Sequence, residues 1–103
     1  GQKYDESLAL SKELVATLPA TDPQNFYMKR MAFYNLVALK NWNEAEKAAQ
    51  ELFNSTLPEG VKYEAKDYTD YATTLKELGR TAEALVKYWK AVELNPDKVE
   101  LLK

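Results

Sequence analysis

The sequence predicts an all-α fold, specifically an α-solenoid of stacked antiparallel helical hairpins. Apolar residues recur along the 103-residue chain at spacings of three and four, as they do on one face of a helix. Three segments beginning at residues 3, 41 and 80 resemble one another, and their equivalent residues Ser7, Ala45 and Ala84 lie 38 and 39 residues apart. A period between 20 and 50 residues is typical of stacked repeats.

The first two predicted helices are separated by a clear stop and start signal. The first helix lies within residues 1–19, and Pro19 ends it. The second helix should begin at Pro23, because Thr21 or Asp22 can act as its N-cap and proline is tolerated in a first turn. Apolar residues cover most of the circumference of this second helix, which predicts neighbours on more than one side.

The third and fourth predicted helices flank a loop. The third helix covers about 42–53 and is rich in alanine, which allows close approach between helices. Residues 54–60 have the composition of a loop. The fourth helix is predicted over about 61–78, and Gly79 follows it as a left-handed C-cap.

The fifth predicted helix covers about 81–94, and an Asn-Pro-Asp sequence at 95–97 interrupts the pattern. Residues 98–103 are predicted to begin another helix. The breaks between the second and third helices, and between the fourth and fifth, are so short that each pair should be antiparallel. The expected fold is therefore about five helices plus a short C-terminal helical segment.

Composition argues against several classes of function. The chain has 14 basic and 16 acidic residues, so a formal net charge of −2 gives no long-range attraction for nucleic acid or anionic membrane. Cysteine and histidine are absent, which removes thiolate chemistry, imidazole catalysis and the commonest zinc ligands. No apolar run approaches 18 residues and no targeting segment is visible, so we expect a soluble chain without membrane insertion.

Residues of the fourth and fifth predicted helices carry a family resemblance. They are Tyr71, Ala72, Leu75, Leu78, Gly79, Ala84, Tyr88, Ala91, Leu94, Asn95 and Pro96. Residues 65–98 resemble the 34-residue tetratricopeptide repeat throughout their length. In that family a small residue seats the second helix of each unit against the first, an aromatic residue and an alanine follow, and a proline ends the unit. Ala84, Tyr88, Ala91 and Pro96 match these positions.

Two other segments resemble the same repeat less closely. Residues 26–52 fill most positions of the motif, but Phe33 stands where the family prefers a small residue and Ala49 where it prefers an aromatic one. This exchange of large and small side chains conserves volume and should pack. Residues 1–19 resemble only the second helix of a preceding unit, with Ser7 as the small residue.

The resemblance implies a tetratricopeptide-like right-handed superhelix, with residues 1–103 as one repeat domain. It would consist of a partial repeat at 1–19, repeats at 23–57 and 61–98, and the start of a further helix at 99–103. The chain would then begin and end within a unit, as in a fragment of a longer protein.

In this family the first helix of each hairpin lines a concave groove that binds a partner protein or peptide. The predicted lining consists of Tyr27, Arg30, Tyr34, Val37, Lys66, Thr69, Asp70, Thr73 and Lys76. Tyrosine and arginine often carry binding energy at interfaces, so Tyr27, Arg30 and Tyr34 are the predicted partner contacts. The function expected is a non-catalytic interaction module that receives a peptide or helix. The alternative is that these side chains only cover the edge of the groove.

A second possible function is assembly through the ends of the stack, either with another copy or with other domains of a parent protein. A repeat array needs polar caps at both ends. The first helix instead carries Leu10 and Leu14 on the face that a preceding helix would cover, and no preceding helix is present. Trp89 lies on the side that would meet the next hairpin. It is interpreted either as an exposed docking residue or as a core residue packed against residues 99–102.

Glu64, Asp67 and Asp70 are spaced by three and would share a helical face, which is the placement that a metal or acid–base cluster requires. Acidic residues in the first turns of a helix more often complement its dipole, and no histidine is present to assist them. We therefore expect no metal, no cofactor and no enzyme activity.

Overall fold

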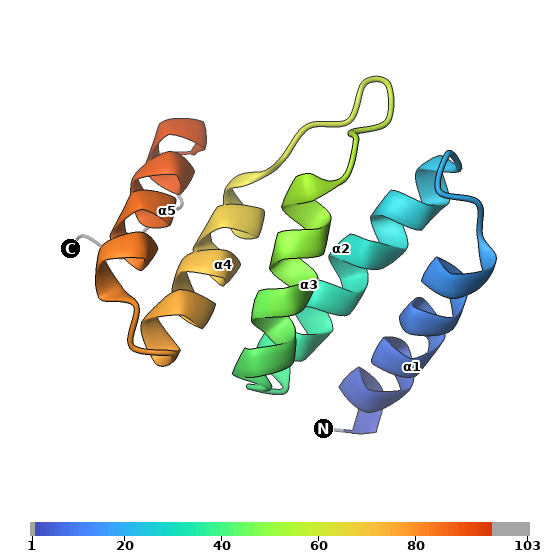
Figure 1. Ribbon diagram of the computed structural model, residues 1–103, viewed down its shortest axis with the longest axis horizontal. Coiled ribbons are helices and arrows are strands. Elements are labelled where there is room, and N and C mark those ends of the chain that lie inside the picture. Colours follow the sequence, from blue (N-terminus) through green and yellow to red (C-terminus); the bar gives the residue numbers. More distant parts are fainter. Residues whose placement is uncertain (1, 96–103) are drawn as a thin grey trace. The chain divides into compact units, whose positions relative to one another are not determined.

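The computed structural model describes residues 2–95, and every regular element in that range is an α-helix. The helices are α1 (Gln2–Thr17), α2 (Pro23–Ala38), α3 (Trp42–Asn54), α4 (Ala65–Glu77) and α5 (Thr81–Leu94) (Figure 1). The predicted all-α chain of about five helices is confirmed at this level. The helical segment predicted at 99–103 lies outside the described residues.

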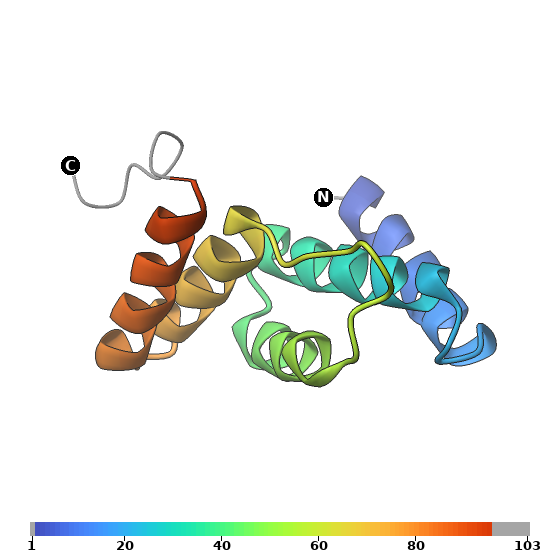
Figure 2. The same cartoon turned by 90° about the horizontal axis from the view of Figure 1, so that it is seen from above.

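The chain divides into two compact units, with the boundary between Val61 and Lys62. In the first unit α2 is central, because α1 packs against it and α3 packs against it as well. Figure 2 shows α1 (blue) and α3 (green) against different sides of α2 (teal). In the second unit α4 and α5 pack against each other as a helical hairpin.

Each unit has its own small core. The buried apolar residues of α2 and α3 are Phe26, Ala32, Phe33, Leu36, Ala45, Ala49 and Leu52. In the second unit Ala72, Leu75 and Ala84 form a buried cluster, and the half-buried rings of Tyr71 and Tyr88 pack against it. Small alanines at the contacts allow the helix backbones to approach closely.

The start of α4 differs from the prediction, since the helix begins at Ala65 rather than near residue 61. The backbone N–H of Glu64 donates to Oδ2 of Asp67 at 2.7 Å, as part of a capping box. This box fixes the first turn of the helix at Ala65. The loop between α3 and α4 consequently covers residues 55–64.

The predicted start of α2 is confirmed by its cap. Asp22 is the N-cap, and its carboxylate accepts a hydrogen bond of 2.9 Å from the backbone N–H of Gln24. Pro23 occupies the first turn, where its missing N–H leaves no donor unsatisfied.

The α2–α3 and α4–α5 turns repeat one another. Each contains a residue in the left-handed conformation, Lys40 with φ 59° and Gly79 with φ 83°. In each turn the N–H of the next residue donates back to a leucine carbonyl, that of Leu36 at 2.9 Å and that of Leu75 at 2.8 Å. This is the Schellman pattern of helix termination. Equivalent atoms are 39 residues apart, so the sequence period is also a period of backbone hydrogen bonding.

The two turns predict opposite effects of exchanging their left-handed residues. Lys40→Gly should raise the free energy of unfolding by about 1 kcal/mol, because a Cβ atom disfavours positive φ. Gly79→Lys should lower it by a similar amount. Apart from Gly79 and its two chain neighbours, no described atom lies within 4 Å of a Cβ built at Gly79, so the loss would come from the backbone rather than from a clash. Urea denaturation of both variants measures these changes, and a destabilised Lys40→Gly would contradict the interpretation.

Candidate functional site

The outward face of α2 carries the first half of the predicted lining. Tyr27, Met31 and Tyr34 follow one another at spacings of four and three, so they share one face of the helix. Tyr27 is 39% exposed and Met31 is 44% exposed, while Tyr34 is half-buried. Met31 is not among the residues predicted to line the groove. The signal that would have found it is its position between the two tyrosines at helical spacing.

The rings of two buried phenylalanines contact those of the tyrosines. The ring of Phe26 meets that of Tyr27 edge to face, with centroids 6.2 Å apart. The rings of Phe33 and Tyr34 are 6.0 Å apart. The guanidinium carbon of Arg30 lies 5.0 Å from the centroid of Phe26, which is cation–π geometry. Buried rings therefore restrict how the side chains of the outward face can move.

The predicted residue Val37 is half-buried, as is Arg30. The stacking of Arg30 on Phe26 fits the interpretation that it covers an apolar edge, and it also holds the cation at one place on the surface. Both interpretations place the arginine on α2 beside the tyrosines.

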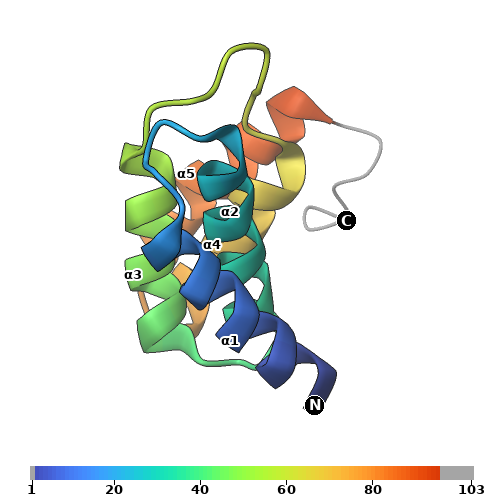
Figure 3. The same cartoon turned by 90° about the vertical axis from the view of Figure 1, so that its right-hand side faces the viewer.

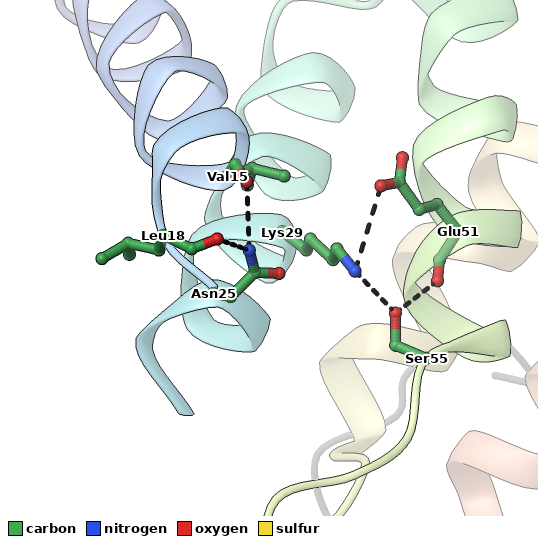
Figure 4. Close-up of polar contacts among 6 residues, drawn as sticks. All are labelled: Val15, Leu18, Asn25, Lys29, Glu51 and Ser55. Carbon is green, nitrogen blue, oxygen red and sulfur yellow. Dashed lines mark hydrogen bonds and ion pairs between the residues drawn. The ribbon is translucent and has the colours of Figure 1, made fainter. Parts of the chain in front are cut away.

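Two buried asparagines hold α2 against α1. The side-chain nitrogen of Asn25 donates to the carbonyl oxygens of Val15 and Leu18, each at 3.0 Å (Figure 4). Near the other end of α2, the side-chain nitrogen of Asn35 donates to Oγ of Ser7 at 2.8 Å. Figure 3 shows α1 and α2 joined by the loop at 18–22 and running in opposite directions. These contacts fix which side of α2 faces outward.

A lysine links α2 to the end of α3. Nζ of Lys29 donates to Oγ of Ser55 at 3.1 Å and lies 4.0 Å from the carboxylate of Glu51 (Figure 4). Oγ of Ser55 in turn donates to the backbone carbonyl of Glu51 at 2.7 Å. The hydroxyl thereby serves both the lysine and the last turn of α3.

The second half of the predicted lining lies on α4, in the second unit. Lys66 and Lys76 are exposed, and Thr69, Asp70 and Thr73 are half-buried. Nζ of Lys66 lies 3.1 Å from Oδ2 of Asp70. Burial raises the pKa of the Asp70 carboxyl above its ordinary value, although the positive charge of Lys66 opposes the change. The α4 face is thus more polar than the α2 face.

The acidic residues at the start of α4 have structural contacts. Asp67 is fully buried and caps the helix through the N–H of Glu64, while Asp70 pairs with Lys66. Within residues 2–95, no three acidic side chains gather closely enough to hold a metal ion. None of the described helices has the length and apolarity needed to cross a bilayer.

The residues predicted for end contacts differ in exposure. Leu10 on α1 is 56% exposed and Leu14 is half-buried. On α5, Trp89 is 53% exposed. Sequence reasoning missed three further exposed apolar residues of this helix, which are Leu85, Val86 and Leu94. The alternative packing of Trp89 against residues 99–102 lies outside the described part of the chain.

The environment of Asp70 predicts a pH-dependent effect of its replacement. The pKa of Asp70 is higher in the folded state than in the unfolded state, so the folded state binds the proton more tightly. The contribution of this carboxyl to stability therefore decreases as the pH rises from about 3 to neutral. Asp70→Asn should therefore stabilise the chain at pH 7 and have little effect near pH 3, as measured by urea denaturation. Asp67→Ala is the control, because it removes the acceptor of the Glu64 N–H, and loss of this cap should cost about 1 kcal/mol at pH 7. A destabilised Asp70→Asn at pH 7 would contradict the assignment.

Comparison with known proteins gave no relative on which a family assignment could rest. No family model matches the chain, and neither a curated protein nor a solved structure matches it.

Proposed function

We propose that this chain is a non-catalytic, tetratricopeptide-like interaction module that binds a peptide or helix of a partner protein. The observation that carries the proposal is the outward face of α2, where Tyr27, Met31 and Tyr34 stand beside Arg30. Tyrosine, methionine and arginine are enriched at protein interfaces relative to other surface. Their backing by buried phenylalanines reduces the side-chain entropy that a partner would have to remove.

Support for a repeat architecture comes from the backbone. The α2–α3 and α4–α5 turns share one hydrogen-bond pattern at a distance of 39 residues. In the proposed right-handed solenoid, α2 and α4 are equivalent helices of successive repeats. The α4 residues Lys66, Thr69, Asp70, Thr73 and Lys76 are then the polar counterpart of the aromatic α2 face.

The chemistry of the α2 face defines a partner. Two tyrosine rings and a thioether offer apolar contact, while the tyrosine hydroxyls and the guanidinium offer hydrogen bonds. A partner segment with apolar side chains and a nearby carboxylate or carbonyl complements this set.

The first test selects random peptides displayed on phage against the immobilised chain and measures the affinity of the enriched peptides. Tyr27→Ala with Tyr34→Ala should weaken binding about tenfold or more, because truncating interface aromatics commonly costs over 1 kcal/mol each. The helix should persist, since alanine favours it.

Tyr4→Ala is the matched control, because Tyr4 is an exposed tyrosine on α1. Equal loss of affinity in the control and in the double variant would contradict the α2 site. So would an unchanged affinity in a folded double variant.

A second candidate function is self-association through exposed helix faces at the ends of the chain. The observation that favours it is the set of large apolar residues exposed on α5, namely Leu85, Val86, Trp89 and Leu94. Exposed apolar groups of this kind often mark interaction surfaces. Leu10 on α1 would contribute to the other end.

Sedimentation across a concentration series tests assembly. The wild-type mass should rise above the 11.8 kDa of one chain as concentration increases, because association would bury the α5 residues. Val86→Glu with Trp89→Glu should remain at the mass of one chain. The control is Ala82→Glu, which adds charge at an exposed small residue of the same helix and should behave as wild type. A wild-type chain that stays monomeric throughout would contradict this candidate.

A further inference from the structure

The first unit contains a cleft between α1 and α3, above α2, with a volume of about 280 Å³. Its apolar residues are Val15 of α1, Ala32 and Leu36 of α2, and Ala48 of α3. In the described part of the chain, α1 and α3 each pack against α2 but not against each other. Because the side chains of Ala32 and Ala48 are small, space remains between α1 and α3. We call this the α1–α3 cleft.

The cleft is separate from the aromatic face of α2. Ala32 precedes Tyr34 by two residues, which is about 200° around a helix with 3.6 residues per turn. A ligand in the cleft would therefore contact a different side of α2 from the proposed partner site.

Charged residues surround the apolar residues of the cleft, and the positive charges outnumber the negative ones. Nζ of Lys12 lies 3.7 Å from Oε2 of Glu44, which joins α1 to α3 across the cleft. The second cleft pair, Lys29 with Glu51, lies on α2 and α3. Lys47 also lines the cleft, and its ammonium makes no ion pair or hydrogen bond with any residue in the range 2–95. The cleft thus presents one uncompensated positive charge beside an apolar floor.

We propose that the α1–α3 cleft is a second binding site, which takes a peptide segment with one large apolar side chain next to a carboxylate. The volume of about 280 Å³ is just below the roughly 300 to 1,000 Å³ typical of pockets for drug-sized ligands, so it suits a single side chain. The apolar side chain would cover Ala32 and Leu36, and the carboxylate would pair with Lys47. The ammonium of Lys12 can donate to a peptide carbonyl, and the carboxylate of Glu44 can accept from a peptide N–H. A simple fatty acid has no backbone to use these groups, so the cleft favours a peptide.

A titration with three small probes tests this site on the intact chain. N-acetyl phenylalanyl-glutamate amide is added to protein with isotope-labelled methyl groups, alongside the phenylalanyl-lysine and glycyl-glutamate versions. The first probe should shift the methyl resonances of Val15, Ala32, Leu36 and Ala48. The lysine version should bind roughly two- to fivefold more weakly, as expected for one exposed ion pair. The glycine version should produce no shifts, because it lacks the apolar side chain.

Two variants decide between this site and another. Lys47→Glu should reverse the preference between the glutamate and lysine probes, whereas Lys3→Glu, at an exposed residue of α1, should not. Ala48→Leu should fill the cleft and abolish the shifts, whereas Gln50→Leu, at an exposed position of α3, should retain them. If Ala48→Leu fails to fold, the exposed Lys47 substitution still decides. Equal affinity for the two charged probes, or shifts confined to Met31, would overturn the proposal and leave the α2 face open as the partner site.

Discussion

The buried amides of Asn25 and Asn35 fix the position of α2 on α1, and both candidate surfaces of the first unit depend on that position. A buried polar group left without its hydrogen bond costs about 1 to 3 kcal/mol. Rotation or sliding of α2 by one turn would remove the partners of both amides at once. The apolar contacts alone are less selective, because aliphatic and aromatic surfaces can pack in several registers. One register places Tyr27 and Tyr34 outward and Ala32 on the floor of the cleft.

Asn25 also provides hydrogen bonds to backbone carbonyl groups at the end of α1. The last carbonyl groups of a helix have no partner within it, and α1 ends before a proline without a left-handed glycine cap. Asn25 supplies donors to two of the carbonyls near that end, from Val15 and Leu18. The same side chain therefore terminates one helix and orients the next.

Local signals in the sequence were sufficient for much of the fold. The cap at Asp22, the turn at Gly79 and the bounds of α5 follow from residues close together in the chain, because caps and turns depend on adjacent backbone groups. The start of α4 was misplaced, since Asp67 is read equally well as a helix residue and as a capping residue. The tyrosines of the candidate site were predictable from helical spacing. The cleft was not, because it requires α1 and α3 to meet α2 from different sides, and no local pattern specifies the space left between alanines on separate helices.

Lys40 and Gly79 have unrelated side chains, yet both serve the same left-handed step between two helices. The two hairpins share a pattern of main-chain hydrogen bonds at this step. Any residue that tolerates the left-handed conformation can form these bonds. An alignment that scores side-chain identity counts this position as a mismatch, although it is a point of closest structural correspondence. Divergence in sequence at such a turn can therefore proceed with the geometry of the hairpin retained.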